Sequence, residues 1–254
     1  MKVLTDILTN IKEDLPVREV RRGIFWTAVA SKHCGLASTM IYESCAQENN
    51  DSNYNLSFTE KTALELAQLV FSESIFDASV GLAAINSLLD IDESRCIDIN
   101  AGELLIRMGV DKNVSVIGHF PFSEELRRVA KNLWIIEKRL KPGDYPEWDA
   151  QIYLPKSDII AISSTTLINH TFHDILNLCP ESSIKMLLGP STPMSSVFFN
   201  YGIHIISGSK VVDEKKALQY ISEGANFRQL KRTGAIKLVT LMQKDMLKQG
   251  GNEI

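Results

Sequence analysis

The sequence lacks most of the features that assign a chain to a familiar class. None of its apolar runs approaches the roughly 18 residues that a membrane-spanning helix needs. An acidic residue, Asp6, interrupts the N-terminal segment too early for a signal-peptide core. The cysteines at positions 34, 45, 96 and 179 form no Cys-x-x-Cys pair and show no other metal-binding spacing. We therefore expect a cytoplasmic protein with reduced thiols and no association with membranes.

Familiar cofactor and catalytic motifs are absent as well. The fingerprint Gly-x-Gly-x-x-Gly does not occur, which argues against a nicotinamide dinucleotide. Gly-x-Ser-x-Gly is missing, and no spacing predicts a catalytic triad. Basic residues form no cluster with interleaved aromatics, so nucleic acid is not an expected partner. The net charge is −7 over residues 1–110 and +3 over residues 111–254, a weak bias towards an anionic small molecule.

Short apolar runs that end in polar or glycine-containing loops dominate the second half of the chain. They predict strands at 114–118, 133–137, 158–163, 184–188 and 203–206, and the intervening segments predict helices near 123–131, 166–178, 194–200 and 213–223. This alternation is typical of a Rossmann-like, mostly parallel sheet. Ligands bind such sheets outside the carboxyl ends of the strands.

The first half has a different pattern. A helical stripe over residues 4–15 precedes an extended segment at 17–30, which turns at Gly23, and two apolar helices follow, from Phe58 and over Ile75–Leu89. The polar segment 47–55 is predicted to be a loop tip or a disordered segment. We expect a small α+β domain at 1–110 and an α/β domain at 111–254.

The strongest candidate site is the run Ser163-Ser164-Thr165-Thr166. A helix N-cap explains one hydroxyl, but four exceed that need, and a helix N-terminus attracts anions or ligand oxygens. Asn169 lies one turn into the predicted helix and is expected to face the same crevice. Thr165, Thr166 and Asn169 are therefore candidate hydrogen-bond donors to a ligand.

Further candidates follow the other strands. Gly118, His119 and Phe120 come after the first strand and would form a neighbouring wall. Glu137 ends the second strand, where Rossmann proteins bind a ribose hydroxyl, although pairing with Lys138 or Arg139 explains it equally well.

A rigid turn, Gly189-Pro190-Ser191, would close the floor of the site, and a purely structural role also accounts for it. Asn86 interrupts an apolar helix. It needs hydrogen-bond partners if buried, either within its own domain or from a ligand at the domain interface.

His170 and His173 are the candidates for metal ligands, because a spacing of three can place both on one helix face. Two ligands alone do not complete a zinc site, which normally takes three or four from the protein. A metal ion or metal chelate as cofactor therefore stays open.

Five segments in the same order resemble those of one family: residues 83–89, 116–121, 158–169, 188–193 and 202–213. It is the family described as a "putative heavy-metal chelation" domain, formerly a domain of unknown function. The resemblance implies an enolase-N-terminal-like α+β domain followed by a Rossmann-like domain, with a site between them. The chain departs from the pattern at Ser164, where glycine is usual, and at His170, where a small residue is common.

We therefore expect a protein that binds a small molecule or a metal chelate between the two domains, at the carboxyl ends of the strands. The alternative is a lyase or transferase that acts on a small anionic metabolite in the same cleft, with His119 or Glu137 as acid or base. The sequence leaves open whether the protein is an enzyme. A homodimer is expected only because twofold symmetry is common.

Overall fold

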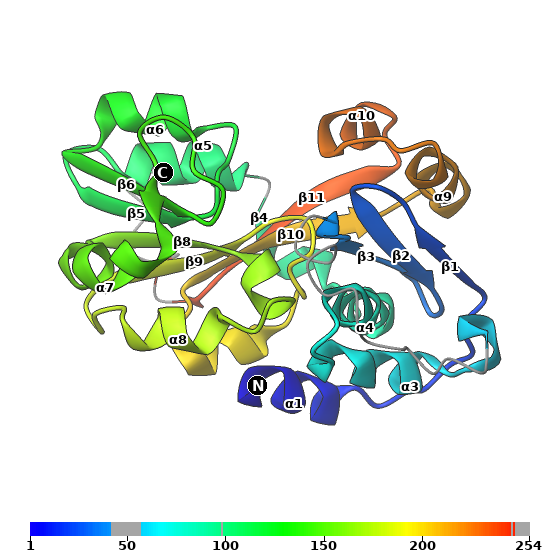
Figure 1. The fold of residues 1–254 in the computed structure, drawn as a ribbon. Helices are drawn as coiled ribbons and strands as arrows, with labels where there is room; N and C mark the ends of the chain where they lie inside the picture. The colour runs from blue at the N-terminus through cyan, green and yellow to red at the C-terminus, as the bar shows by residue number, and fades with distance from the viewer. Residues whose placement is uncertain (42–56, 98, 245, 247–254) are drawn as a thin grey trace.

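The computed structural model describes residues 1–41, 57–97, 99–244 and 246, and places them in two β-sheets flanked by helices (Figure 1). The small sheet is antiparallel and has the order β1-β2-β3. Its strands are β1 (Glu19–Arg22), β2 (Trp26–Ala30) and β3 (Cys34–Ser38). The large sheet has eight strands in the order β4-β11-β10-β9-β8-β5-β6-β7. The predicted fold class, a mostly parallel α/β sheet preceded by a small α+β part, is confirmed.

The central strands of the large sheet are parallel. They are β5 (Asn113–Ile117), β6 (Asn132–Glu137), β8 (Ile159–Ser163), β9 (Ile184–Leu188) and β10 (Ile205–Val211), with the short β7 (Tyr145–Pro146) beside β6. At the far edge, β11 (Ile236–Met242) runs antiparallel to β10, and β4 (Cys96–Ile97) antiparallel to β11. The chain leaves β5 for β6 on one side and returns to β8 on the other. The strand order therefore reverses at β5, and such a switch point opens a crevice at the carboxyl ends.

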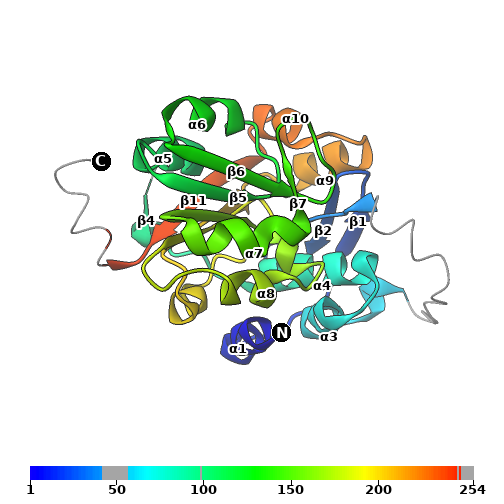
Figure 2. The same cartoon turned by 60° about the vertical axis from the view of Figure 1, so that its left-hand side comes forward.

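Alternate residues of the parallel strands belong to two hydrophobic clusters, as expected for a sheet buried on both faces. Val114 and Val116 of β5 cluster with residues of α5 (Ala101–Met108) and α6 (Ser123–Val129). Ile117 belongs to the other cluster, which includes residues of α7 (Ala150–Tyr153) and α8 (Phe172–Asn177). Figures 1 and 2 show these two helix pairs on opposite faces.

The small sheet is also covered on both faces. Val29 and Ala37 face α4 (Ile75–Leu88), nearly all of whose residues are buried, and α1 (Lys2–Asn10) and α3 (Ala63–Ala67) complete that layer. Trp26 and Leu36 pack on α9 (Glu214–Ser222) and α10 (Phe227–Arg232). Because α9 and α10 lie between β10 and β11 of the large sheet in the chain, and one hydrophobic cluster holds residues of both parts, the small and large parts pack directly on each other.

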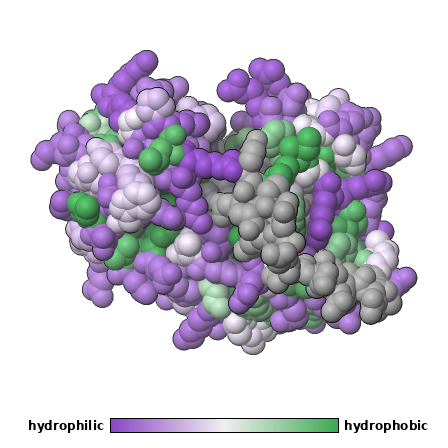
Figure 3. Space-filling view, in the orientation of Figure 1, coloured by the Kyte–Doolittle hydropathy of each residue, from purple (hydrophilic) through white to green (hydrophobic). Residues whose placement is uncertain are grey.

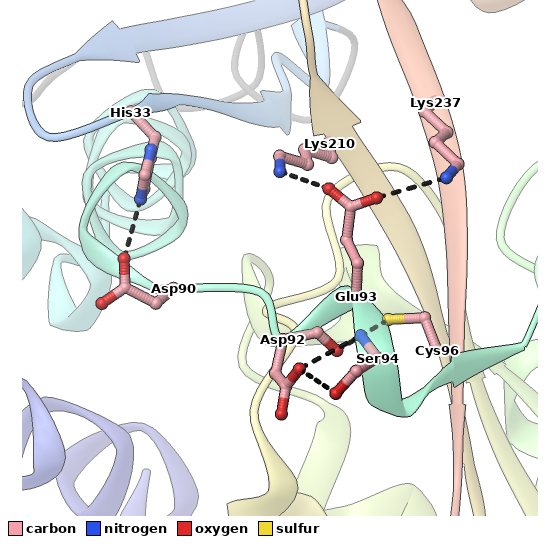
Figure 4. A network of polar contacts seen from close by, with 8 residues as sticks. All are labelled: His33, Asp90, Asp92, Glu93, Ser94, Cys96, Lys210 and Lys237. Carbon is pink, nitrogen blue, oxygen red and sulfur yellow. Dashed lines mark hydrogen bonds and ion pairs between the residues drawn. The ribbon is translucent and has the colours of Figure 1, made fainter.

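The linker between α4 and β4 is tied to both parts by charged contacts (Figure 4). Asp90 pairs with Lys32 at 2.7 Å and with His33 at 2.9 Å. Glu93 pairs with Lys210 of β10 at 2.6 Å and Lys237 of β11 at 3.3 Å. The hydrogen bond from Lys32, followed by that from His33, lowers the pKa of Asp90. The bond from Lys210, followed by that from Lys237, lowers the pKa of Glu93.

Several predicted elements differ from the observed ones. The predicted helix 166–178 is broken: a 3-10 turn spans Ser164–Leu167, His170 adopts a left-handed backbone with φ of 63°, and α8 begins only at Phe172. The predicted helix 194–200 is a 3-10 helix at Ser196–Tyr201. Strands β4, β7 and β11 were not predicted. Residues 96–97 and 101–108 were expected with the first domain, but β4 pairs with β11 and α5 packs on the large sheet.

The predicted loop tip at 47–55 lies outside the described residues. Within the described part of the chain, no helix is long and apolar enough to cross a bilayer.

Candidate functional site

A pocket of about 250 Å³ lies at the switch point, and we call it the switch-point pocket. One wall comes from the ends of β5, β6 and β8 and includes five of the predicted site residues: Gly118, Glu137, Thr165, Thr166 and Asn169. The opposite wall comes from α8 and from the segment after β7, with Trp148, Ala150, Ile175 and Leu178. All of these residues belong to the large α/β part. The pocket is therefore not shared with the small sheet.

The four hydroxyls after β8 have different roles. Ser163 caps the turn by accepting from the backbone N–H of Thr165 at 3.4 Å, and Thr166 Oγ1 donates to the carbonyl of Ser163 at 2.7 Å. Ser164 is buried. Thr165 is partly exposed and lines the pocket, and among the described residues its Oγ1 has a single hydrogen-bond partner, the Ser163 hydroxyl at 2.8 Å. Thr165 is the hydroxyl in this run that can turn to a ligand without breaking a backbone contact.

Asn169 and Glu137 present complementary groups to the pocket. Asn169 Oδ1 accepts from the hydroxyl of Thr171 at 2.8 Å, and its Nδ2 has no hydrogen-bond partner within the described chain. Glu137 Oε1 accepts from the backbone N–H groups of Lys138 and Arg139 at 2.8 and 3.3 Å, which orients the carboxylate. The pocket thus offers an amide donor and a fixed carboxylate acceptor beside Thr165.

The charged residues around the pocket are mostly acidic. Glu137, Glu147 and Asp174 line it together with one cation, Lys138. The rest of the lining is largely apolar, and Trp148, a residue that is 68% exposed, lies at its edge. This composition favours a neutral or cationic organic group with hydroxyl or amine substituents.

The remaining candidates lie elsewhere. Phe120, Gly189 and Pro190 line a second, larger hollow on the other face of the sheet. Ser191 is buried at the junction of the two sheets, where its hydroxyl accepts from the backbone N–H of Ser38 at 2.9 Å.

Asn86 also bridges that junction. Its Nδ2 donates to the carbonyl of Leu36 at 2.8 Å and to that of Ser191 at 2.9 Å. Both its own domain and the neighbouring one therefore supply partners. Asn86 also borders a small pocket of about 110 Å³ between the two sheets, together with Cys34 and Lys210.

His119 is held by a buried carboxylate. Its Nδ1 lies 3.2 Å from Oδ2 of Asp144, whose side chain is inaccessible to solvent. The same oxygen accepts from the backbone N–H of Lys141 at 3.0 Å, while Oδ1 is buried without a partner among the described residues. An Asp–His pair of this kind fixes the orientation of the ring. His119 is not part of the switch-point lining.

The two candidate metal ligands make structural contacts. His170 Nε2 lies 2.9 Å from the carbonyl of Val70, across the junction with the small part. His173 packs edge-on against Phe172 and Tyr201, and burial lowers its pKa. Because His170 precedes α8 in a left-handed conformation, the helical spacing that suggested a shared face does not apply.

Direct coordination of a metal ion by the protein would need several ligating side chains close together. Among the described residues, no three of His, Cys, Asp or Glu come close enough together to hold a metal ion. Zinc and similar ions normally need three or four protein ligands. The described residues therefore do not fit a metal held by protein side chains alone.

Family models match both parts of the chain. One matches residues 100–240 and a second matches residues 5–89, and both are described as "Putative heavy-metal chelation". The chain belongs to this family. Its description supports a role in binding metal chelates.

One relative matches in sequence and two solved structures match in fold. An uncharacterised protein of Methanocaldococcus jannaschii is 26% identical over 249 residues, 93% of each chain. A crystal structure of a DUF364-family protein from Desulfitobacterium hafniense superposes with a TM-score of 0.81 at 24% identity, covering 95% of this chain and 98% of that one. One from Pyrococcus horikoshii gives 0.80 at 19% identity, with the same coverage.

Sequence reasoning did not find the second wall of the switch-point pocket. Trp148 lies on a segment that was not assigned to a site, and Asp174 and Ile175 lie in the predicted helix 166–178 but were not named as candidates. A usable signal was the concentration of aromatic residues at 145, 148 and 153 in a stretch without strand or helix periodicity. Two of these rings, Tyr145 and Tyr153, pack with centroids 4.5 Å apart and anchor the segment.

Proposed function

We propose that this protein binds a small organic molecule, alone or as a metal chelate, in the switch-point pocket. The observation that carries the proposal is the convergence of Thr165, Asn169 and Glu137 on one apolar-walled pocket at the strand ends. Thr165 and the Asn169 amide, which has no donor contact among the described residues, donate to ligand oxygens, and Glu137 accepts from a hydroxyl or amine. The metal is then cargo, held by donor atoms of the organic ligand.

The charge of the pocket narrows the ligand class. Three carboxylates and one lysine border it, so a ligand with several negative charges would meet repulsion. A neutral or cationic chelate, or an amine, suits the site. This differs from the anionic ligand that the sequence charge alone favoured.

The test is to identify what the untagged protein carries after gentle purification, by native mass spectrometry and elemental analysis. We expect an additional mass, with metal in constant proportion to it, in the wild type. Thr165→Val should lose most of that mass with a nearly unchanged melting temperature. Thr9→Val, which alters a threonine exposed on α1, is the matched control and should keep it.

Two outcomes contradict the proposal. One is retention of the mass in Thr165→Val at wild-type occupancy. The other is metal that stays on the polypeptide after the organic mass has been removed, because it would require protein ligands.

Enzymatic activity is a second candidate, favoured by the His119–Asp144 pair. A buried aspartate that orients a histidine leaves the second ring nitrogen available for proton transfer. In this reading His119 or Glu137 acts as acid or base in a lyase or transferase. Turnover of the identified ligand should disappear in His119→Ala and fall strongly in Asp144→Asn while binding persists. Activity that survives in His119→Ala removes this histidine from the reaction.

A further inference from the structure

A second hollow at the strand ends has a volume of about 440 Å³, larger than the switch-point pocket and within the range of small-molecule sites. We call it the notch pocket, because it lies between α5 and α6 on one side and α10 on the other, above β9, β10 and β11. Figure 1 shows these helices facing each other across the sheet, and Figure 3 shows the notch between the two lobes at the top of the molecule. It is on the opposite face of the sheet from α7 and α8, so it is separate from the switch-point pocket.

One side of the notch pocket is aromatic. The rings of Phe120 and Phe122 stack with centroids 5.1 Å apart and planes 11° from parallel. Phe122 is held close to α5, because a Cβ on Gly102 would lie only 2.6 Å from its ring. A stacked pair that is fixed in this way offers an edge and a face to a further planar ring.

The other side is basic. Arg228 and Lys231 lie three residues apart on α10 and both line the pocket. Neither side chain has an ion pair or hydrogen bond within the described part of the chain. The helix that carries them is fixed by the capping box of Asn226 and Gln229 and by the fully buried Leu230. Two unpaired cations on a fixed helix face form a receptor for a carboxylate, sulfonate or phosphate.

Acidic residues limit where the anionic end of a ligand can lie. Glu103 of α5 and Glu125 of α6 line the wall opposite α10, and neither is paired among the described residues. An anionic group is therefore attracted to α10 and repelled from α5 and α6. The same carboxylates, with Asn100 beside them, can accept from an amino or hydroxyl substituent.

We propose that the notch pocket is a second binding site, for a planar aromatic compound that carries one anionic group. The ring lies against Phe120 and Phe122, and the anion is bound by Arg228 and Lys231. This site is independent of the proposed switch-point ligand, which is neutral or cationic and binds on the other face.

The probe is anilinonaphthalene sulfonate, whose fluorescence rises in an apolar site, titrated into the full-length protein. We expect saturable binding that weakens at least about tenfold in the double variant Arg228→Gln, Lys231→Gln, because two charge-assisted contacts are lost. Arg232→Gln, on the same helix but outside the lining, should bind like the wild type. So should Thr165→Val, which separates this site from the switch-point pocket.

A neutral analogue completes the test. N-phenylnaphthylamine has the same ring system without the sulfonate and should bind the wild type more weakly, with an affinity that the double variant does not change. Equal sulfonate affinity in the double variant and the wild type overturns the proposal. So does the absence of saturable binding to the wild type, or a loss in Arg232→Gln as large as in the double variant.

Discussion

Replacing Asn86 should destabilise the whole molecule, because this amide connects the two sheets. Its Nδ2 donates to Leu36 at the small sheet and to Ser191 in the loop after β9. Asn86→Ala removes both donors and leaves two carbonyl oxygens at the junction without this partner. The Oδ1 atom is already buried without a partner among the described residues, so its removal costs nothing.

The expected magnitude follows from the two lost bonds. A hydrogen bond contributes about 0.5–1.5 kcal/mol net, and an acceptor left buried and unpaired costs about 1–3 kcal/mol. For two partly buried carbonyls we expect a total loss of about 2–4 kcal/mol. For a chain of this size that corresponds to a decrease in melting temperature of roughly 4–16 °C.

The assay is urea denaturation followed by circular dichroism, with the slope of the transition checked for two-state behaviour. Asn177→Ala, an exposed asparagine on α8, is the control and should change the free energy of unfolding by less than about 0.5 kcal/mol. A second variant, Asn86→Asp, tests whether the donor role of the amide is what matters. At pH 7 its carboxylate faces two carbonyl oxygens, so it should be less stable than Asn86→Ala, and it should recover part of the difference near pH 4, where a protonated carboxyl can donate one bond.

A change below about 0.5 kcal/mol in Asn86→Ala would refute this reasoning. It would mean that water replaces the amide without a loss in the free energy of unfolding, and that the two hydrogen bonds of Asn86 do not stabilise the junction between the sheets.

Two further predictions concern packing and pH. Gly81→Ala should destabilise the protein by at least about 2 kcal/mol, although alanine favours helices by about 1 kcal/mol, because the new Cβ would lie 2.0 Å from the backbone nitrogen of Val70. Gly202→Ala should cost only about 1 kcal/mol, because Gly202 has φ of 75° but open space around it. Equal urea midpoints for the two variants would contradict the steric argument. Burial lowers the pKa of His173 and of His204, so these histidines take up protons in the unfolded chain at a higher pH than in the folded one. The free energy of unfolding should therefore fall as the pH decreases through about 6.5. The urea midpoint at pH 7, 6 and 5 measures this fall, and a constant midpoint would contradict it. Below about pH 4.5 the lowered pKa values of Asp90 and Glu93 add to the loss, since their ion pairs persist only while the carboxylates are charged.

The parallel strands were predictable because each is a short apolar run buried on both faces, and such runs keep their pattern whatever packs on them. Ile159–Ser163 and Ile184–Leu188 match the predicted strands within one residue. β11 was not predicted, although Ile236–Met242 is rich in apolar residues, because its pairing with β10 is a long-range choice that no local signal specifies.

The helix after β8 was predicted too long for a local reason. The apolar periodicity of residues 166–178 continues through His170, but the left-handed backbone at that residue ends the first turn and restarts the chain as α8. The same break turns the His170 ring to the carbonyl of Val70. A backbone outlier at a histidine cannot be inferred from periodicity, and the shared helix face of His170 and His173 depended on its absence.

The loop after β5 shows why a Rossmann-like sheet does not imply a Rossmann ligand. Gly118 has φ of 98°, and a Cβ there would lie 3.1 Å from that of Ser163, so this glycine serves the close approach of two loops. A dinucleotide fold uses the next helix N-terminus to bind a diphosphate. Here α6 has Glu124 and Glu125 in its first turn, which oppose an anion at that end. An anionic group on this face is therefore expected at α10 rather than at α6, which is the arrangement that the Arg228 and Lys231 variants measure.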